Sequence, residues 1–326
     1  MEGSSTVARL RENLRYDGLW WRKFAYVGCV YGPEWWKRYS PPAIAAIIFM
    51  LVGRTRRGAT ANLQRILGDV SRSRAQRAAL RMFAEFAHCF TESMEHYGPR
   101  PQPIRIDIPA GDELAKALTR GHGAVVVTGH FGNWDVAAKE LRAYGRPINV
   151  VMAREVNATT SAYVRRAREA AGVQVIYSDS SVFSSLNMIR ALRRNEVVAI
   201  QLDRPMDADG TRLVPFFGAS AAFPSGPFVL ARVAGVPLIP VFVPRLGTRH
   251  YAVRVCGRFD IAREARDSRA LERVMAQVAV AFEAVVREFP TQWFQFRPFW
   301  PADGVQGQAA ASNGPDVSRE RLRASR

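Results

Sequence analysis

Apolar and polar residues follow two alternating patterns in the part of the chain beyond Pro103. Short runs rich in β-branched residues predict strands, and longer segments with an apolar residue at every third or fourth position predict helices. The predicted strands are 123–128, 147–152, 173–177, 197–202 and 237–243, and the predicted helices lie near 133–143, 159–171, 181–193, 225–234 and 268–288. Strands that alternate with helices form βαβ units. The sequence therefore predicts an α/β fold with a mostly parallel, mixed sheet and helices on both of its faces.

The segment from Ala59 to Tyr97 has a helical pattern throughout. It predicts two helices that are separated near Gly68, because glycine is unfavourable inside a helix. The second helix carries an apolar stripe made of Leu80, Phe83, Ala87, Phe90 and Met94. We expect this stripe to pack on the sheet domain or to enter a membrane in part.

The N-terminal pattern predicts a segment that lies at a membrane interface. Residues 1–15 lack the apolar core of a signal peptide. An apolar run from Ala43 to Val52 has a cluster of aromatic residues before it and a cluster of arginines after it. The run is much shorter than the roughly 20 apolar residues that cross a bilayer, but such flanks are typical of segments at the level of the lipid headgroups. The alternative is a buried core helix.

These patterns divide the chain into three parts. Residues 1–57 are predicted to form the N-terminal anchoring segment, and residues 58–301 the α/β domain together with its leading helices. Residues 302–326 are rich in Gly, Ala, Ser and Arg, a composition that predicts a disordered tail.

The charge of the chain favours an acidic partner. Lys and Arg number 46 against 29 Asp and Glu, which gives a formal net charge of +17. Almost all of the basic residues are arginines, whose planar guanidinium binds phosphate through two hydrogen bonds. They are spread along the chain, and no zinc finger or RNA-binding motif accompanies them, which argues against nucleic acid. The three cysteines form no CxxC pair, so neither a disulfide framework nor a zinc site is indicated.

The segment 125–135, Val-Val-Val-Thr-Gly-His-Phe-Gly-Asn-Trp-Asp, contains the strongest catalytic candidate. It predicts a buried strand that ends at Gly129 and a helix with Asn133 as its N-cap. His130 then lies in a strand-to-helix turn, where α/β proteins usually keep their chemistry. Asp135 is predicted to accept a hydrogen bond from one nitrogen of His130, so that the other can take a proton. The alternative is a structural His130, with Asp135 as a favourable charge at the helix N-terminus.

The run His-Phe-Gly-Asn-Trp-Asp resembles the HX4D/E motif of the glycerolipid acyltransferase superfamily. It is most similar to the bacterial lipid A biosynthesis (lauroyl/myristoyl) acyltransferases and to the related phosphatidylinositol mannoside acyltransferases of mycobacteria. The resemblance implies that His130 is the general base and that Asp135 orients it. Many lipid A enzymes have Glu where this chain has Asp135, and a complete N-terminal transmembrane helix is not predicted here.

Later segments resemble further blocks of the same family, over roughly residues 20–300 in all. Arg154 resembles an arginine that helps to hold an anionic substrate group. Asp203 and Arg204 follow a predicted strand, and Gly218 lies in a segment that resembles the block that binds substrate and shapes the acyl pocket. The resemblance thus implies substrate-binding roles for these four residues.

The expected chemistry needs no covalent acyl-enzyme, because the chain has no GxSxG motif and no cysteine near His130 in sequence. His130 would deprotonate a hydroxyl of the acceptor as that hydroxyl attacks an acyl thioester, and Asp135 would stabilise the imidazolium. Backbone NH groups of the turn, at Gly132 and Asn133, would stabilise the oxyanion. No metal or other cofactor is expected.

The expected donor is a thioester of acyl carrier protein or coenzyme A, since both are acidic. The expected acceptor is a membrane lipid or glycolipid. The expected location is the cytoplasmic face of the bacterial inner membrane, where the protein would bind the anionic surface as a peripheral or monotopic protein. Two other functions remain open at this point. One is acyl transfer to a lysophospholipid or to glycerol phosphate, and the other is a non-catalytic basic protein that binds membranes.

Overall fold

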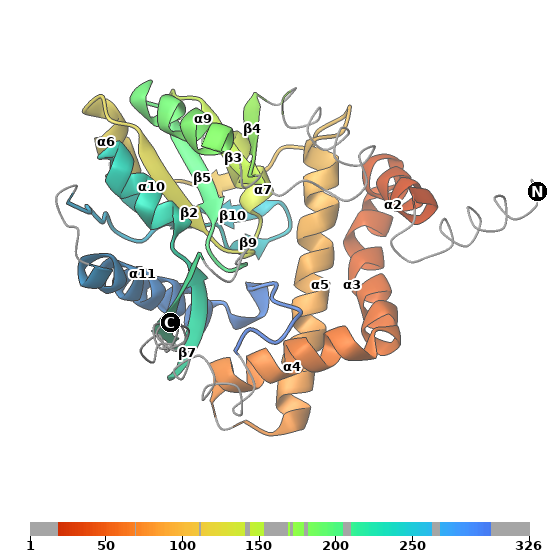
Figure 1. The fold of residues 1–326 in the computed structure, drawn as a ribbon. Helices are drawn as coiled ribbons and strands as arrows, with labels where there is room; N and C mark the ends of the chain where they lie inside the picture. The colour runs from red at the N-terminus through yellow and green to blue at the C-terminus, as the bar shows by residue number, and fades with distance from the viewer. Residues whose placement is uncertain are drawn as a thin grey trace, which may run out of the picture.

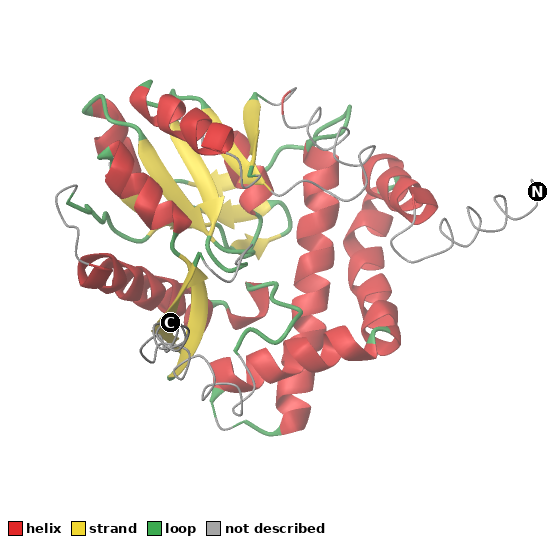
Figure 2. Cartoon of the chain, viewed as in Figure 1, coloured by secondary structure: helices red, strands yellow, loops and turns green. Residues whose placement is uncertain are grey.

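A computed structural model of the chain describes residues 19–300 except 69, 111, 141–143, 153–168, 170–171, 179–181, 205–209 and 263–267. Helices and strands alternate along its second half, as Figures 1 and 2 show. The largest sheet has the order β11-β8-β2-β5-β3-β4. Its strands are β2 (Ala124–Thr128), β3 (Ile148–Met152), β4 (Val173–Tyr177), β5 (Val197–Gln201), β8 (Leu238–Phe242) and β11 (Arg254–Val255). Only β11 pairs in antiparallel fashion among these strands, so the predicted α/β fold is confirmed.

The predicted elements of this domain agree closely with the structure. All five predicted strands are present, within one residue at each end. The matching helices are α7 (Trp134–Glu140), α9 (Val182–Arg193), α10 (Gly226–Ala234) and α11 (Ser268–Glu288). The helix predicted at 159–171 lies almost wholly outside the described residues. Helix α6 (Glu113–Thr119), which Asp112 caps, precedes β2 and was not predicted.

The order of the strands determines where the candidate chemistry lies. Strand β5 pairs with both β2 and β3, so it lies between two strands that precede it in sequence. β2 and β5 are parallel and in register from end to end, and their last residues, Thr128 and Gln201, are partners. The amide of Leu202 then donates to the carbonyl of Thr128 at 2.8 Å. The residues that follow β2 and β5 therefore emerge side by side at one edge of the sheet.

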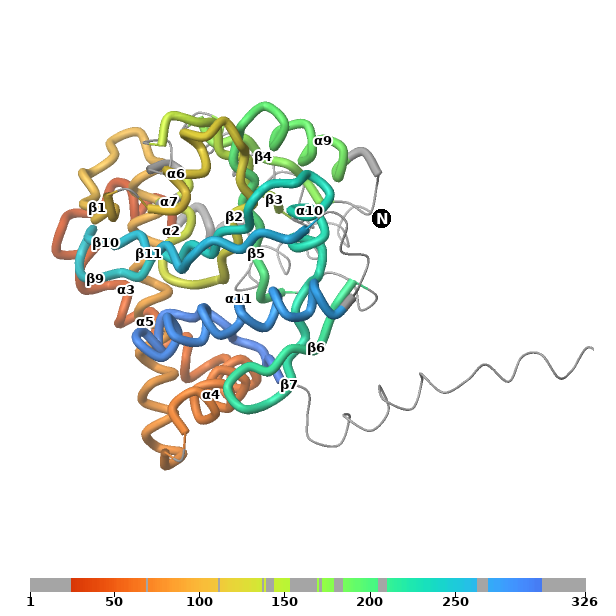
Figure 3. The backbone as a smooth tube through the Cα atoms, turned by 90° about the vertical axis from the view of Figure 1, so that its left-hand side faces the viewer, coloured from red at the N-terminus to blue at the C-terminus, as the bar shows by residue number. Residues whose placement is uncertain are grey.

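Two smaller sheets flank the main one. Strands β1 (Arg105–Asp107), β10 (His250–Ala252) and β9 (Arg245–Gly247) form one of them. Strands β6 (Thr211–Phe216) and β7 (Ala219–Pro224) form the other, a hairpin that turns at Phe217 and Gly218, both with positive φ. Positive φ at both central residues is the geometry of a type I′ turn, which suits the twist of a hairpin. Helix α11 lies against β6 and also contacts α4 (Figure 3).

Residues 19–96 form a layer of helices beside the sheet domain (Figure 1). Its members are α2 (Leu19–Tyr31), α3 (Glu34–Leu51), α4 (Gly53–Leu67) and α5 (Arg72–His96). The predicted break near Gly68 separates α4 from α5, and helix α3 contacts both of these helices. The predicted division of the chain at residue 57 falls inside α4.

The predicted apolar stripe of α5 is only partly correct. Phe83 is buried, but Leu80 and Phe90 are 36% and 40% exposed. The buried face of α5 instead carries small and apolar residues in its first half and polar residues, among them Glu92 and Glu95, in its second half. A pattern of apolar residues does not predict this buried polar face. The two glutamates are buried because arginines from a distant part of the chain bind them.

Helix α3 contains the predicted apolar run and has one largely exposed face. Pro41 and Ala45 are its buried residues. Its exposed large apolar residues are Trp35, Tyr39, Ile44, Ile47, Ile48, Met50 and Leu51. Within the described part of the chain, no helix is both long enough and apolar enough to cross a membrane.

Asn62 of α4 ties the helical layer to the segment after α11. Its amide donates to the carbonyls of Gln295 and Arg297 at 2.8 and 2.7 Å, and it accepts from the amide of Phe299 at 3.0 Å. The side chain is only 1% exposed, so water cannot replace these bonds.

We predict that Asn62→Leu lowers the free energy of unfolding by about 3 kcal/mol, because buried backbone groups lose their partners. Urea unfolding followed by circular dichroism measures the change. The control is Gln64→Leu, an exposed position on the same helix, which should stay within about 0.5 kcal/mol of the parent protein. Equal effects of the two substitutions would contradict the assigned role of Asn62.

Candidate active site

His130 occupies the turn between β2 and α7, as predicted. Gly132 has φ +56°, and a Cβ there would lie 1.9 Å from the carbonyl oxygen of Val243, so the turn requires glycine. Asn133 accepts a hydrogen bond from the amide of Val136 at 3.2 Å, which confirms it as the N-cap of α7. On the other side of the turn, the carbonyl of His130 accepts from the amide of Phe294 at 2.7 Å. The imidazole is thus carried by a backbone that is fixed at both ends.

The carboxylate that lies against Nδ1 of His130 is that of Asp203. Nδ1 of His130 lies 2.7 Å from Oδ1 of Asp203, and the backbone amide of His130 donates to Oδ2 at 2.8 Å. The indole of Trp293 also donates to Oδ2, at 2.8 Å. Asp203 is 0% exposed, whereas the side chain of His130 is 19% exposed. Nδ1, and not Nε2, is therefore the imidazole nitrogen that faces Asp203.

The pairing of His130 with Asp135 stays a prediction, and Asp203 is the carboxylate that the structure places against Nδ1 of His130. Asp135 lies in the first turn of α7 and is half-buried, and its backbone carbonyl accepts from the hydroxyl of Tyr97 at 2.7 Å. Nδ1 points instead toward the end of the neighbouring strand β5, where Asp203 emerges. The spacing of the motif suggested a local partner, but the adjacent parallel strand supplies the carboxylate.

The surroundings of Asp203 keep its carboxylate ionised. Burial is the strongest influence and would raise the pKa of this carboxyl. The charge of His130, together with the hydrogen bonds from His130 and Trp293, outweighs burial, so that the pKa lies below its ordinary value. The carboxylate of Asp203 is fully buried and bonded to the protein itself, and its substrate-binding role stays a prediction.

The backbone amides predicted to stabilise an oxyanion are already bonded. The amide of Gly132 donates to the carbonyl of Gln292 at 2.9 Å, and the amide of Asn133 donates to the carbonyl of Val243 at 3.0 Å. Both bonds hold the turn against neighbouring strands and loops, so they are part of the scaffold. Both amides would have to give up these bonds to bind an oxyanion, and the oxyanion role of Gly132 and Asn133 stays a prediction.

The remaining predicted site residues differ in their placement. Arg204 directly follows Asp203, and its side chain is exposed. Partial burial of the guanidinium lowers the pKa of Arg204. The charge of Asp203 raises this pKa, and the nearby charge of Arg297 lowers it further. Gly218 occupies the turn of the β6–β7 hairpin, and its substrate-binding role stays a prediction. Arg154 lies outside the described residues.

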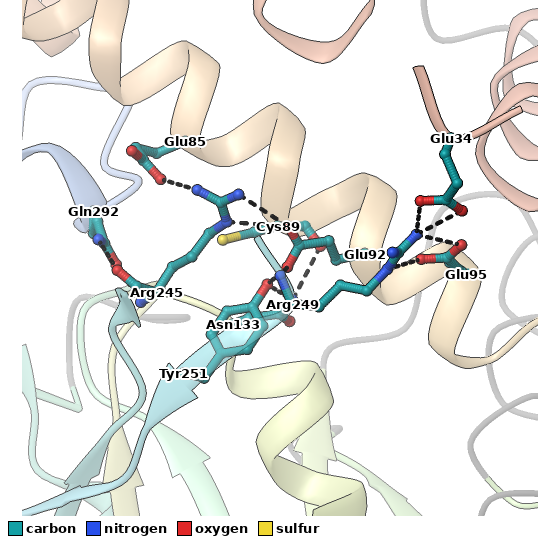
Figure 4. A network of polar contacts seen from close by, with 10 residues as sticks. All are labelled: Glu34, Glu85, Cys89, Glu92, Glu95, Asn133, Arg245, Arg249, Tyr251 and Gln292. Carbon is teal, nitrogen blue, oxygen red and sulfur yellow. Dashed lines mark hydrogen bonds and ion pairs between the residues drawn. The ribbon is translucent and has the colours of Figure 1, made fainter. Parts of the chain in front are cut away.

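Asn133 connects the catalytic turn to helix α5 through a buried network of polar contacts (Figure 4). It accepts from the hydroxyl of Ser93 at 2.8 Å and donates to the carbonyl of Cys89 at 3.1 Å. It also donates to the hydroxyl of Tyr251 at 3.0 Å, and that hydroxyl donates to Glu92. Burial, with Cys89 and Glu92 nearby, raises the pKa of Tyr251, so its hydroxyl keeps its proton.

Arg245 of β9 lies beside the same glutamate (Figure 4). Its guanidinium donates to Glu92 at 3.0 and 3.1 Å and to Glu85 at 3.3 Å. Its backbone exchanges two hydrogen bonds with the side chain of Gln292, at 2.7 and 2.8 Å. Because the carbonyl of Gln292 holds the amide of Gly132, this network supports the catalytic turn from a second direction.

Arg249 extends the network to the N-terminal helices (Figure 4). Its guanidinium donates to Glu95 of α5 at 2.7 and 3.0 Å and to Glu34 of α3 at 2.9 and 3.0 Å. Lys37 of α3 also donates to Glu95, at 2.7 Å. Helices α3 and α5 are thus held together next to the segment that contains Tyr251.

Sequence reasoning missed Trp293, Tyr251 and Glu92. None of them lies near His130 in sequence, and their residue types suit a core as well as a site. The available signal was the dense aromatic run at 293–300, which indicated a buried segment without indicating what it packs against. In the part of the chain that the structure describes, no group of three or more His, Cys, Asp or Glu side chains could hold a metal ion.

Comparison with known proteins identifies the family of the chain. The family model described as bacterial lipid A biosynthesis acyltransferase matches residues 7–301. A phosphatidylinositol mannoside acyltransferase of Mycolicibacterium smegmatis is 27% identical over 248 residues, which are 74% of this chain and 78% of that protein. A protein of the same name from Mycobacterium tuberculosis is 28% identical over 205 residues, 61% of each chain. With a family match over almost its whole described length, the chain belongs to the bacterial lipid A biosynthesis acyltransferase family and is an acyltransferase.

Proposed function

We propose that this enzyme transfers a fatty acyl group from an acyl thioester to a hydroxyl of a glycolipid acceptor, with His130 as general base and Asp203 as its orienting partner. The observation that carries this proposal is the 2.7 Å contact between Nδ1 of His130 and Asp203. This bond places the imidazole proton on Nδ1 and leaves Nε2 as the basic nitrogen. A buried carboxylate in that position also stabilises the imidazolium that forms during proton transfer.

The reaction is a direct displacement on the thioester. Nε2 of His130 takes the proton of the acceptor hydroxyl as its oxygen bonds to the acyl carbon. The carbon–sulfur bond then breaks, and the imidazolium returns the proton to the leaving thiolate. The chain would need no acyl-enzyme for this route, and the proposed donor is a thioester of acyl carrier protein or coenzyme A.

The relatives suggest the class of acceptor. The mycobacterial proteins are named for phosphatidylinositol mannoside, a glycolipid with a phosphate in its headgroup. Beside Asp203, the adjacent charges of Arg204 and Arg297 suit such an anionic headgroup. We therefore propose a phosphate-bearing glycolipid as the acceptor, in preference to a soluble alcohol.

The proposed site of action is the surface of the inner membrane, at its cytoplasmic face. The exposed apolar face of α3 fits attachment at the lipid interface. Exposed apolar side chains of this size are costly in water, and several lie on one helix face, including Ile47 and Leu51. Arg54 and Arg57, just beyond this helix, are exposed and suit anionic headgroups.

We predict that His130→Ala lowers kcat for acyl transfer by about 10² to 10⁴, because the general base is lost. The assay follows transfer from a radiolabelled acyl thioester to a phosphatidylinositol mannoside acceptor. Circular dichroism serves as the control for folding. Near-parental turnover by a folded His130→Ala protein would exclude the mechanism.

Two conservative substitutions separate the candidate partners of His130. We expect Asp203→Asn to lower kcat by about 10² to 10⁴, because the amide disfavours the required tautomer and cannot stabilise the imidazolium. Asp135→Asn changes the carboxylate that the motif spacing singles out, and it should lower kcat by less than about tenfold. A larger loss from Asp135→Asn than from Asp203→Asn would assign the orienting role to Asp135 after all.

Membrane attachment through α3 can be tested with liposomes. Leu51 is 78% exposed, and burying a leucine contributes about 1.5–3 kcal/mol. Leu51→Glu should therefore reduce flotation with anionic liposomes roughly tenfold or more. The control is Val280→Glu, which adds the same charge at a 66% exposed position on α11. High salt should release only part of the parent protein, since apolar burial is not screened. Equal flotation of the two variants would exclude α3 as the anchor.

A further inference from the structure

Two buried polar atoms beside the catalytic pair have no hydrogen-bond partner within the described structure. They are the hydroxyl oxygen of Thr128 and the amide nitrogen of Gln201. Thr128 is only 8% exposed. Buried polar groups in proteins are almost always bonded, and an unpartnered pair costs stability unless it serves a ligand.

Both atoms belong to the last residues of the two strands that lead into the catalytic pair. Thr128 is the last residue of β2, two positions before His130, and Gln201 is the last residue of β5, two positions before Asp203. The two residues are register partners on adjacent parallel strands. Side chains of register partners emerge on the same face of a sheet, so the hydroxyl and the amide lie near one another.

That face of the sheet borders a cavity with an otherwise apolar lining. Thr128 and Gln201 line it together with Val126 of β2, Val150 of β3, Val241 of β8 and Trp134 of α7. The cavity has room for about two water molecules, so it fits a small polar group and not a fatty acyl chain. The carbonyl oxygen of an acyl thioester is a group of this size.

The reaction also requires donors that the turn does not supply. Negative charge collects on the carbonyl oxygen when the acceptor hydroxyl attacks, and preorganised donors stabilise this charge. The amides of Gly132 and Asn133 are already committed to backbone carbonyls. The indole NH of Trp293 is committed to Asp203. The hydroxyl of Thr128 and the amide of Gln201 are thus uncommitted donors at the end of β2 and β5 where the pair emerges.

We propose that Thr128 and Gln201 form the oxyanion site, in which both side chains donate to the carbonyl oxygen of the donor's acyl group. This inference rests on the proposed acyl transfer by His130. As the acceptor oxygen bonds to the acyl carbon, the carbonyl electron pair moves to the oxygen and is held by the two donors. It returns when the carbon–sulfur bond breaks, and the proton passes through His130 to the thiolate.

The test removes each donor with little change of shape. Thr128→Val and Gln201→Leu should each lower kcat by about 10² to 10³ with little change of KM, because the donors act mainly in the transition state. Thr128→Ser keeps a hydroxyl and should keep kcat within about tenfold of the parent. The melting temperature of Thr128→Val should stay equal or rise, because a buried unpartnered hydroxyl is removed.

A matched control exists on α4. Thr60 is buried to the same degree, at 7% exposure, but its hydroxyl donates to the carbonyl of Arg56 at 2.8 Å. Thr60→Val should leave kcat unchanged. If Thr128→Val and Gln201→Leu both keep kcat within twofold of the parent, the inference is overturned. An unchanged kcat with a lower melting temperature would show that Thr128 binds only a structural water.

The outcome also separates this inference from the proposed function. An active His130→Ala protein would contradict both the acyl-transfer mechanism and the oxyanion site. An inactive His130→Ala protein, together with fully active Thr128→Val and Gln201→Leu proteins, would contradict only the oxyanion site. Selective loss of kcat in all three variants supports both.

Discussion

The arrangement of the active site depends on one buried negative charge, the carboxylate of Asp203. A carboxylate without exposure is costly unless hydrogen bonds and an opposite charge surround it. Here the donors come from two different parts of the chain: the backbone and imidazole of His130, and the indole of Trp293. The amide of Gln295 also binds the carbonyl of Asp203, at 3.1 Å. Satisfying this charge therefore fixes the end of β5, the catalytic turn and the segment after α11 in one arrangement.

The sheet domain and its leading helices were largely predictable, because each depends on local patterns. The five parallel strands and the N-cap at Asn133 follow from β-branched runs and a capping residue. The partner of His130 was not predictable in this way. Asp203 is 73 residues away, and it reaches the imidazole only because β5 lies between β2 and β3. Strand order is set by packing across the whole sheet, which a local pattern does not contain.

The buried polar face of α5 explains a second failure of prediction and has a structural consequence. Glutamates at the end of a helix indicate a solvent-exposed face, but Glu92 and Glu95 are 5% and 3% exposed. Arg245 and Arg249, from the strands and turn that follow β8, supply the opposite charges. Removing one member of such a pair leaves a buried charge alone, which is far more costly than never having had the pair. The network therefore holds α5 in one position relative to the catalytic turn.

The same contacts relate the exposed apolar face of α3 to the turn that carries His130. Glu34, at the start of α3, binds Arg249, and the backbone amide of Arg249 donates to Glu92 at 3.2 Å. Glu92 accepts from Tyr251, which accepts from Asn133, three residues after His130. This chain of contacts is exposed at Glu34 and buried or partly buried from Arg249 inward, and it links the position of α3 to that of the turn. A lipid surface that contacts α3 would therefore meet the active site at a fixed depth, which suits an acceptor whose hydroxyl lies a set distance above the acyl chains.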